Sequence, residues 1–134
     1  METLLSMLIM GTVFSTVLLA YTHSSKRAEW SGMSLAAQAM ATRQMEQFFA
    51  AKWDTQSLPQ VDQTTNVPLS VISVLDLPVS GTNVVWATNN AVITNLTIST
   101  NPVVNIKMIT VNTTWAFQGT VYTNKVVDYR SPDQ

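Results

Sequence analysis

The side chains that most often carry chemistry are few in this sequence and widely spaced. His23 is the only histidine, and it directly follows a long apolar run. Nucleophilic catalysis would require a nucleophile and an orienting carboxylate around it, and nothing near it suggests either. The chain has no cysteine, so disulfides and thiolate metal sites are excluded. We therefore expect no catalytic residue and no enzymatic activity.

The aspartates do not form a recognisable ligand set. They are scattered along the chain, without the Asp-x-Asp-x-Asp spacing of a calcium loop: Asp54, Asp62, Asp76, Asp128 and Asp133. Asp128 and Asp133 are a candidate calcium pair, although solvated surface is the preferred interpretation. No glycine-rich phosphate loop occurs. We expect no metal and no cofactor.

Glu2 is the unusual acidic residue, because it stands at the start of an apolar run. Residues 1–23 read METLLSMLIMGTVFSTVLLAYTH, and Glu2 is the only charge among the first 20. About 20 apolar residues span the hydrocarbon core of a bilayer, so the run predicts a transmembrane helix. A carboxylate inside lipid is costly and needs a partner. Two interpretations stay open: Glu2 meets such a partner, or it lies at the interface and residues 4–23 form the span.

The helix is predicted to continue to about residue 53, because the first proline is Pro59. Residues 24–53 are amphipathic, and one stripe recurs at spacings of three or four: Met33, Ala37, Met40, Gln44 and Phe48. Ala36, Met45 and Phe49 flank that stripe. This periodicity is typical of a helix that packs one face against a core. A ligand groove is the alternative interpretation.

The remaining residues predict a loop followed by strands. Residues 54–68 are polar and contain prolines, which indicates a loop. Strands are predicted at 69–77, 83–88, 91–99, 103–117 and 120–130, with turns at 79–81, Asn89-Asn90, Asn101-Pro102 and Gln118-Gly119. The last turn has the length of a two-residue hairpin.

Alternation within the longest strand predicts how the helix and the sheet meet. One face carries Ile109, Val111, Thr113, Trp115 and Phe117. We expect this face to pack on the amphipathic half of the helix. The predicted fold class is α+β: a long N-terminal helix, with a transmembrane half (1–23) and an amphipathic half (24–53), packed on a loop and small antiparallel sheet (54–134).

Charge and composition restrict the class of partner. The chain has 134 residues and a net charge of −1, and it has no basic patch. Nucleic acid binding therefore has no electrostatic basis here. Threonine and asparagine are abundant after residue 62, which suits an extracytoplasmic β-domain.

Three segments together resemble a known family. ETLLSMLIMG (2–11) places one glutamate before an apolar helix that contains Gly11. MSLAAQAMATRQMEQFF (33–49) is alanine-rich and amphipathic, and a hairpin closes the chain from residue 109. These segments resemble the type IV pilin-like proteins, which include minor pilins and the minor pseudopilins of type II secretion. The resemblance covers the whole chain and is most specific over residues 2–20.

The resemblance implies a structural subunit of a type IV pilus or of a type II secretion pseudopilus. Such a subunit is anchored in the inner membrane by one helix before assembly, and its C-terminal domain lies in the periplasm or in the filament. The implied role of Glu2 is to neutralise the N-terminal amine of a neighbouring subunit and so set the register. Gly11 is implied as a point where the helix melts locally on assembly. Other pilin or pseudopilin subunits are the implied partners.

The family has a short basic leader ending in glycine, which a prepilin peptidase removes before the new N-terminus is methylated. Here Met1 stands directly before Glu2, so the usual leader is lacking. We expect prepilin peptidase to be a partner if an upstream leader exists. The positive-inside rule places Lys26 and Arg27 in the cytoplasm, whereas the resemblance places the C-terminal domain outside it, and the orientation stays open.

A second hypothesis is a single-pass membrane protein whose small extracytoplasmic β-domain binds a ligand or a partner. Trp86, Trp115 and Tyr122 are the aromatic residues that would form such a site. Core packing is the preferred interpretation of each of them.

Overall fold

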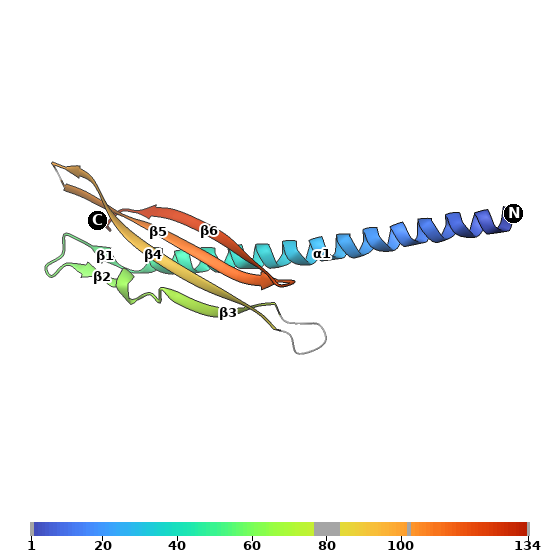
Figure 1. Ribbon diagram of the computed structural model, residues 1–134. Coiled ribbons are helices and arrows are strands. Elements are labelled where there is room, and N and C mark those ends of the chain that lie inside the picture. Colours follow the sequence, from blue (N-terminus) through green and yellow to red (C-terminus); the bar gives the residue numbers. More distant parts are fainter. Residues whose placement is uncertain (1, 77–83, 102, 134) are drawn as a thin grey trace. The chain divides into compact units, whose positions relative to one another are not determined.

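A computed structural model of the chain describes residues 2–76, 84–101 and 103–133 and has an α+β fold, which confirms the predicted class (Figure 1). The chain divides into two compact units, Met1–Met33 and Ser34–Gln134. Helix α1 (Glu2–Ala50) contributes to both. We call the first the helix unit and the second the sheet unit.

The helix unit is continuous α-helix, whose surface is mainly apolar as far as Tyr21 and polar beyond it. Every side chain from residue 2 to residue 32 is exposed. Five of its hydroxyl groups donate to carbonyls three or four residues earlier, as Ser6 does to Glu2 at 2.9 Å and Ser15 to Gly11 at 2.8 Å. Such bonds satisfy the hydroxyl groups inside the helix itself. The helix is long enough and apolar enough to span a membrane by length and composition.

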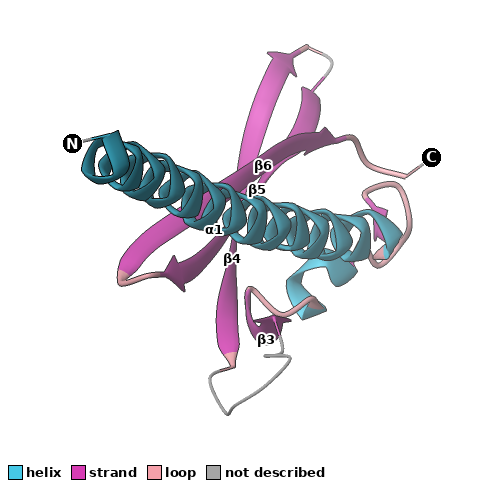
Figure 2. Ribbon diagram, turned by 90° about the vertical axis from the view of Figure 1, so that its right-hand side faces the viewer, coloured by secondary structure: helices cyan, strands magenta, loops and turns pink. Residues whose placement is uncertain are grey.

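The sheet unit holds a four-stranded antiparallel sheet against the C-terminal part of α1 (Figures 1 and 2). Its strands follow one another in space as they do in sequence: β3 (Ser70–Asp76), β4 (Val85–Thr100), β5 (Val103–Phe117) and β6 (Thr120–Arg130). The hairpin between β5 and β6 has the predicted bounds. Gln118 and Gly119 have φ angles of 50° and 79°, which is the left-handed geometry that two-residue hairpins favour.

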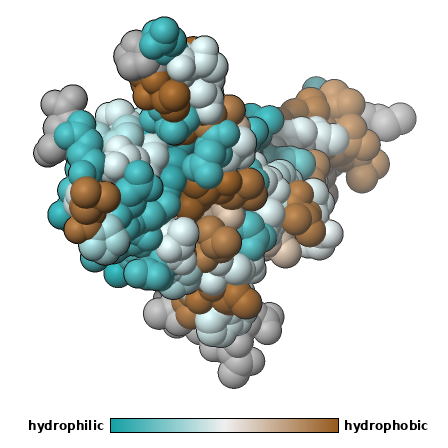
Figure 3. All heavy atoms as spheres, turned by 90° about the vertical axis from the view of Figure 1, so that its left-hand side faces the viewer, coloured by the Kyte–Doolittle hydropathy of each residue, from teal (hydrophilic) through white to brown (hydrophobic). Residues whose placement is uncertain are grey.

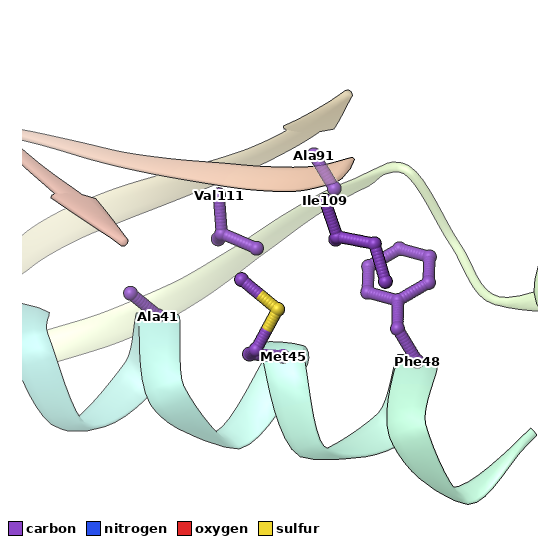
Figure 4. Close-up of a cluster of buried hydrophobic side chains, with 6 residues drawn as sticks. All are labelled: Ala41, Met45, Phe48, Ala91, Ile109 and Val111. Carbon is purple, nitrogen blue, oxygen red and sulfur yellow. The ribbon is translucent and has the colours of Figure 1, made fainter. Parts of the chain in front are cut away.

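The core of the sheet unit lies between α1 and the face of β5 predicted to meet it. Figure 4 shows its six buried side chains: Ala41, Met45, Phe48, Ala91, Ile109 and Val111. Phe48 and Ile109 point toward one another, and Val111 reaches toward the helix between Ala41 and Met45. Alanines at positions 41 and 91 leave room for the larger side chains, which allows the close packing typical of protein interiors.

Two positions in this interface differ from the predicted stripe. Met45 was expected beside the stripe, but it is only 4% exposed and belongs to the core. Ala41 is fully buried, so the packed line continues from Ala37 through Ala41 to Met45. Phe117 is only partly buried, because it is the last residue of β5.

The prediction of a turn at Asn89-Asn90 was wrong. Both residues lie inside β4, which is one strand of 16 residues where two were expected. Asn89 is 4% exposed, and its side-chain amide has protein partners on both sides. A buried amide whose nitrogen and oxygen both have hydrogen-bond partners is compatible with a strand, and these tertiary bonds override the local turn preference of asparagine.

The segment expected as a loop contains short regular elements. Strands β1 (Trp53–Asp54) and β2 (Val61–Asp62) pair antiparallel, and the 3-10 helix η1 (Gln63–Asn66) follows them. Asp62 caps η1, since its carboxylate accepts from the Thr64 backbone N–H at 3.2 Å. The turn predicted at 79–81 and residue Pro102 lie outside the described residues.

Candidate functional site

The two residues proposed for assembly lie in the helix unit. Glu2 begins α1, where a carboxylate is favoured by the helix dipole. No ion pair among the described residues involves its carboxylate. A Cβ built on Gly11 would have no atom within 4 Å, so nothing within one copy of the chain requires glycine there.

The residues predicted to pack between helix and sheet are mostly buried. Ala37 and Phe48 are fully buried, and Met33 is 5% exposed. Trp115 is 3% exposed and stacks on Tyr122 of β6, with ring centroids 5.8 Å apart. Met40 is only partly buried, and its backbone carbonyl makes the more specific contact described next.

Two asparagines in a row of polar side chains across the sheet donate to the backbone of α1. Asn89, Thr113 and Asn124 are paired neighbours on β4, β5 and β6. The Asn89 side chain donates to the Met40 carbonyl at 3.1 Å and accepts from the Thr113 hydroxyl at 2.6 Å. Asn124 donates to the Ser34 carbonyl at 2.7 Å. We call these three residues the amide row, and the sequence pattern signalled only the inward position of Thr113.

Because a carbonyl oxygen has two lone pairs, these bonds can be added to the hydrogen bonds within the helix. They contact α1 at two carbonyls six residues apart, so they specify the position of the helix along the sheet. Nonpolar contacts alone specify register less sharply, because they have no direction. The amide row is therefore the positioning element of the sheet unit.

The C-terminal end of α1 is capped by the last residues of the chain. Arg130 is 5% exposed and donates to the Phe48 carbonyl, and its guanidinium also pairs with Asp133 at 2.9 Å. Asp133 in turn accepts from the Trp53 backbone N–H at 2.7 Å. A cation at this end of a helix satisfies an orphan carbonyl and favours the dipole. No local pattern indicates the contacts of Arg130 with Phe48 or of Asp133 with Trp53, because these partners are 82 and 80 residues apart in sequence.

A second buried cation fastens η1 to the sheet. Lys107 is 4% exposed, and its ammonium donates to Asp62 at 2.5 Å and to Thr64 at 2.6 Å. The same nitrogen lies 4.6 Å from the centroid of the Trp53 ring. A carboxylate, a hydroxyl and an aromatic face together offset the loss of water around a buried charge.

These contacts set the electrostatics of the carboxylates. Burial raises the pKa of Asp62, but hydrogen bonds from Lys107 and Thr64 outweigh it and hold that pKa below the ordinary value. The backbone N–H of Trp53, followed by Arg130, lowers the pKa of Asp133. In Asp54 the backbone N–H groups of Gln56 and Ser57 lower the pKa.

The described residues contain no group of three or more His, Cys, Asp or Glu side chains that could hold a metal ion. Of the candidate calcium pair, Asp133 is occupied by Arg130 and Trp53, while Asp128 accepts from the Tyr129 backbone N–H at 2.8 Å. His23 is exposed on α1.

The outer face of the sheet keeps apolar groups at the surface. Trp86 is 57% exposed, whereas Trp115 is buried on the opposite face. Figure 3 shows hydrophobic surface interspersed with hydrophilic surface on the visible face of the molecule.

No family model, curated protein or solved structure matches this chain.

Proposed function

We propose that the protein is a structural subunit of a type IV pilus or of a type II secretion pseudopilus, anchored in the inner membrane before assembly. The observation that carries this proposal is the change of chemistry along one unbroken helix. Residues 3–21 of the helix unit expose mainly apolar side chains on every side, whereas residues 34–50 are packed on the sheet. A helix that is apolar on every side is stable only in lipid or among other helices.

Glu2 is the proposed register residue. In an apolar environment its carboxylate requires an opposite charge, and no described residue of the same chain forms an ion pair with it. The N-terminal ammonium of a neighbouring subunit supplies that charge in this proposal. Only one axial offset between subunits brings the two groups together, so the pair selects a register.

The proposed partners are other pilin or pseudopilin subunits, the inner membrane and, if an upstream leader exists, a prepilin peptidase. The sheet unit lies in the periplasm or in the assembled filament. The hydroxyl groups of Ser6, Thr12, Ser15, Thr16 and Thr22 bond to carbonyls of the helix itself, which supports passage through lipid, where no water is present to bond them.

The deciding experiment is the intact mass and N-terminal sequence of the protein isolated from native membranes. A methylated N-terminus a few residues upstream of Glu2 is the expected result, because it records prepilin processing. An N-terminus at Met1, or a cut after Ala20, would contradict the proposal. Glu2→Ala should leave the protein in the membrane and lower its incorporation into filaments.

The alternative is a single-pass membrane protein whose β-domain binds a ligand or partner. The exposure of Trp86 favours it, since a large aromatic side chain on an open sheet face suits recognition. The chain has no cysteine, so one cysteine introduced in the helix unit can only cross-link to another chain. Oxidation to a disulfide-linked dimer of the chain supports the filament subunit, and a protein that stays monomeric under the same oxidation supports the binding module.

A further inference from the structure

A groove in the sheet unit lies between α1 and the first strand of the main sheet. Its volume is about 660 Å³, within the range of pockets that bind ligands. Helix α1 lines it with Met40, Arg43 and Gln44, and β3 lines it with Val71, Ser73 and Val74. The segment 66–68 lines it as well.

The groove includes the outer edge of β3. Neighbouring residues of a strand point to opposite faces of the sheet, and both Ser73 and Val74 line the groove, as expected of a cavity that reaches the strand edge. Among the described strands, β3 pairs only with β4. Native proteins protect such edges with charges, prolines or covering segments. The stretch Ser70–Leu75 contains neither a charge nor a proline.

Two polar groups in the groove indicate what occupies it. Gln44 is 3% exposed, and its amide nitrogen donates to the Pro68 carbonyl at 2.8 Å. Its oxygen Oε1 is buried and accepts no hydrogen bond from the described residues. A buried acceptor without a donor is costly, so an occupant that offers an N–H group would be favoured there.

Arg43 defines the charge of the occupant. Among the described residues that line the groove, Arg43 is the only charged one and none is acidic. None of the ion pairs among the described residues involves Arg43. Charge complementarity therefore favours a carboxylate, which a guanidinium binds through paired hydrogen bonds.

We propose that the groove binds an extended peptide segment of a partner protein, which adds to β3 as a fifth strand and places a carboxylate on Arg43. The backbone of the peptide pairs with the free edge of β3, and one of its N–H groups donates to Gln44 Oε1. A small anion would contact Arg43 but leave the strand edge unpaired. Strand addition in this form obtains affinity from main-chain bonds and specificity from the flanking side chains. The site is separate from the helix unit, so the inference does not depend on filament assembly.

The test uses the full chain in detergent micelles and two fluorescein-labelled hexapeptides of alternating threonine and valine. One ends in a free carboxylate and the other in a carboxamide. The acid should bind about five- to tenfold more tightly than the amide, the size of one partly exposed charge-assisted contact. In NMR spectra of the ¹⁵N-labelled chain, the acid should shift the backbone amides of residues 70–74.

Arg43→Gln should remove the preference for the acid and leave the binding of the amide peptide unchanged. Lys125→Gln is the matched control, because it removes the same charge from an exposed position on β6. An acid preference that survives in Arg43→Gln, shifts confined to β6, or no binding at millimolar peptide would overturn the proposal. Complete displacement of the peptide by millimolar acetate would also overturn it, because it would indicate a small-anion site.

Discussion

At the scale of the residue, amide side chains have the roles that sequence patterns assign least well. Asparagine favours turns because its side chain bonds to nearby backbone, and that local preference led to a turn being predicted at Asn89. In the folded chain its two partners are Thr113 and the Met40 carbonyl, 24 and 49 residues away in sequence. Partners at such separations leave no local pattern, so the amide row could not be predicted.

We expect Asn89→Ala to lower the free energy of unfolding by about 1–3 kcal/mol, because the Thr113 hydroxyl loses its acceptor and the Met40 carbonyl loses a donor in a buried site. Urea unfolding of the full chain in detergent, followed by tryptophan fluorescence, measures the change. Asn90→Ala is the control, since Asn90 is the exposed neighbour in the same strand. Adding Thr113→Val to Asn89→Ala should cost less than the sum of both changes. Equal losses from Asn89→Ala and Asn90→Ala would disprove the role of the amide row.

The lowered pKa values of Asp62 and Asp133 predict a loss of stability in acid. A carboxyl group whose pKa is lower in the folded state stabilises the fold above its unfolded pKa, near 3.8, and this contribution disappears as the pH falls through the folded value. Thermal unfolding followed by circular dichroism from pH 7 to pH 2.5 should therefore show the melting temperature falling below about pH 4.

Replacing Asp62 isolates one of these contributions. Asp62→Asn should lower the melting temperature at pH 7, since Lys107 loses its carboxylate, and should reduce the further loss in acid. Asp76→Asn serves as the control, because it removes an equal charge at a position that contacts neither Lys107 nor Arg130 in any of the ion pairs among the described residues. The interpretation fails if Asp62→Asn and Asp76→Asn give the same melting temperatures across the whole pH range.

At the scale of the element, the sequence predicts best where the signal is local. The bounds of β5 and β6 follow from β-branched runs on both sides of a turn that contains a glycine, and both are as predicted. The predicted stripe on the helix contained Met40 where the packed face contains Ala41. The cause is that the single methyl group of Ala41 carries little weight in a hydrophobic pattern. Tertiary contact decides this position instead: Ala41 is fully buried where α1 approaches the sheet.

Ala41→Leu tests how closely helix and sheet are packed. The extra atoms have no space beside Val111, so we expect a loss of about 1–3 kcal/mol in unfolding free energy (Figure 4). Ala39→Leu introduces the same side chain at an exposed position two residues earlier and should be nearly neutral. Urea unfolding in detergent compares the two variants. Similar stability of both would mean that the interface has room for a leucine.

At the scale of the whole molecule, the two units have opposite relations to water. The sheet unit buries its apolar residues in a core of its own, whereas the helix unit leaves long side chains such as Leu4 and Met7 at least 70% exposed. Burial of apolar surface contributes about 25 cal/mol per Å², so the helix unit gains most of its stability from lipid or from other copies of the chain. The sequence of the helix unit predicts that its apolar surface must be covered, but it does not predict whether lipid or other copies of the chain cover it.

The two glycines of α1 allow a matched test of assembly. Neither Gly11 nor Gly32 has an atom within 4 Å of a built Cβ, so alanine fits at both positions in one copy of the chain. Each change should favour the helix by about 1 kcal/mol. If α1 melts locally at Gly11 when a subunit enters a filament, Gly11→Ala should reduce incorporation while Gly32→Ala leaves it unchanged. Immunoblots of sheared filaments and of membranes give the incorporated fraction, and equal fractions for both variants would remove Gly11 from the assembly mechanism.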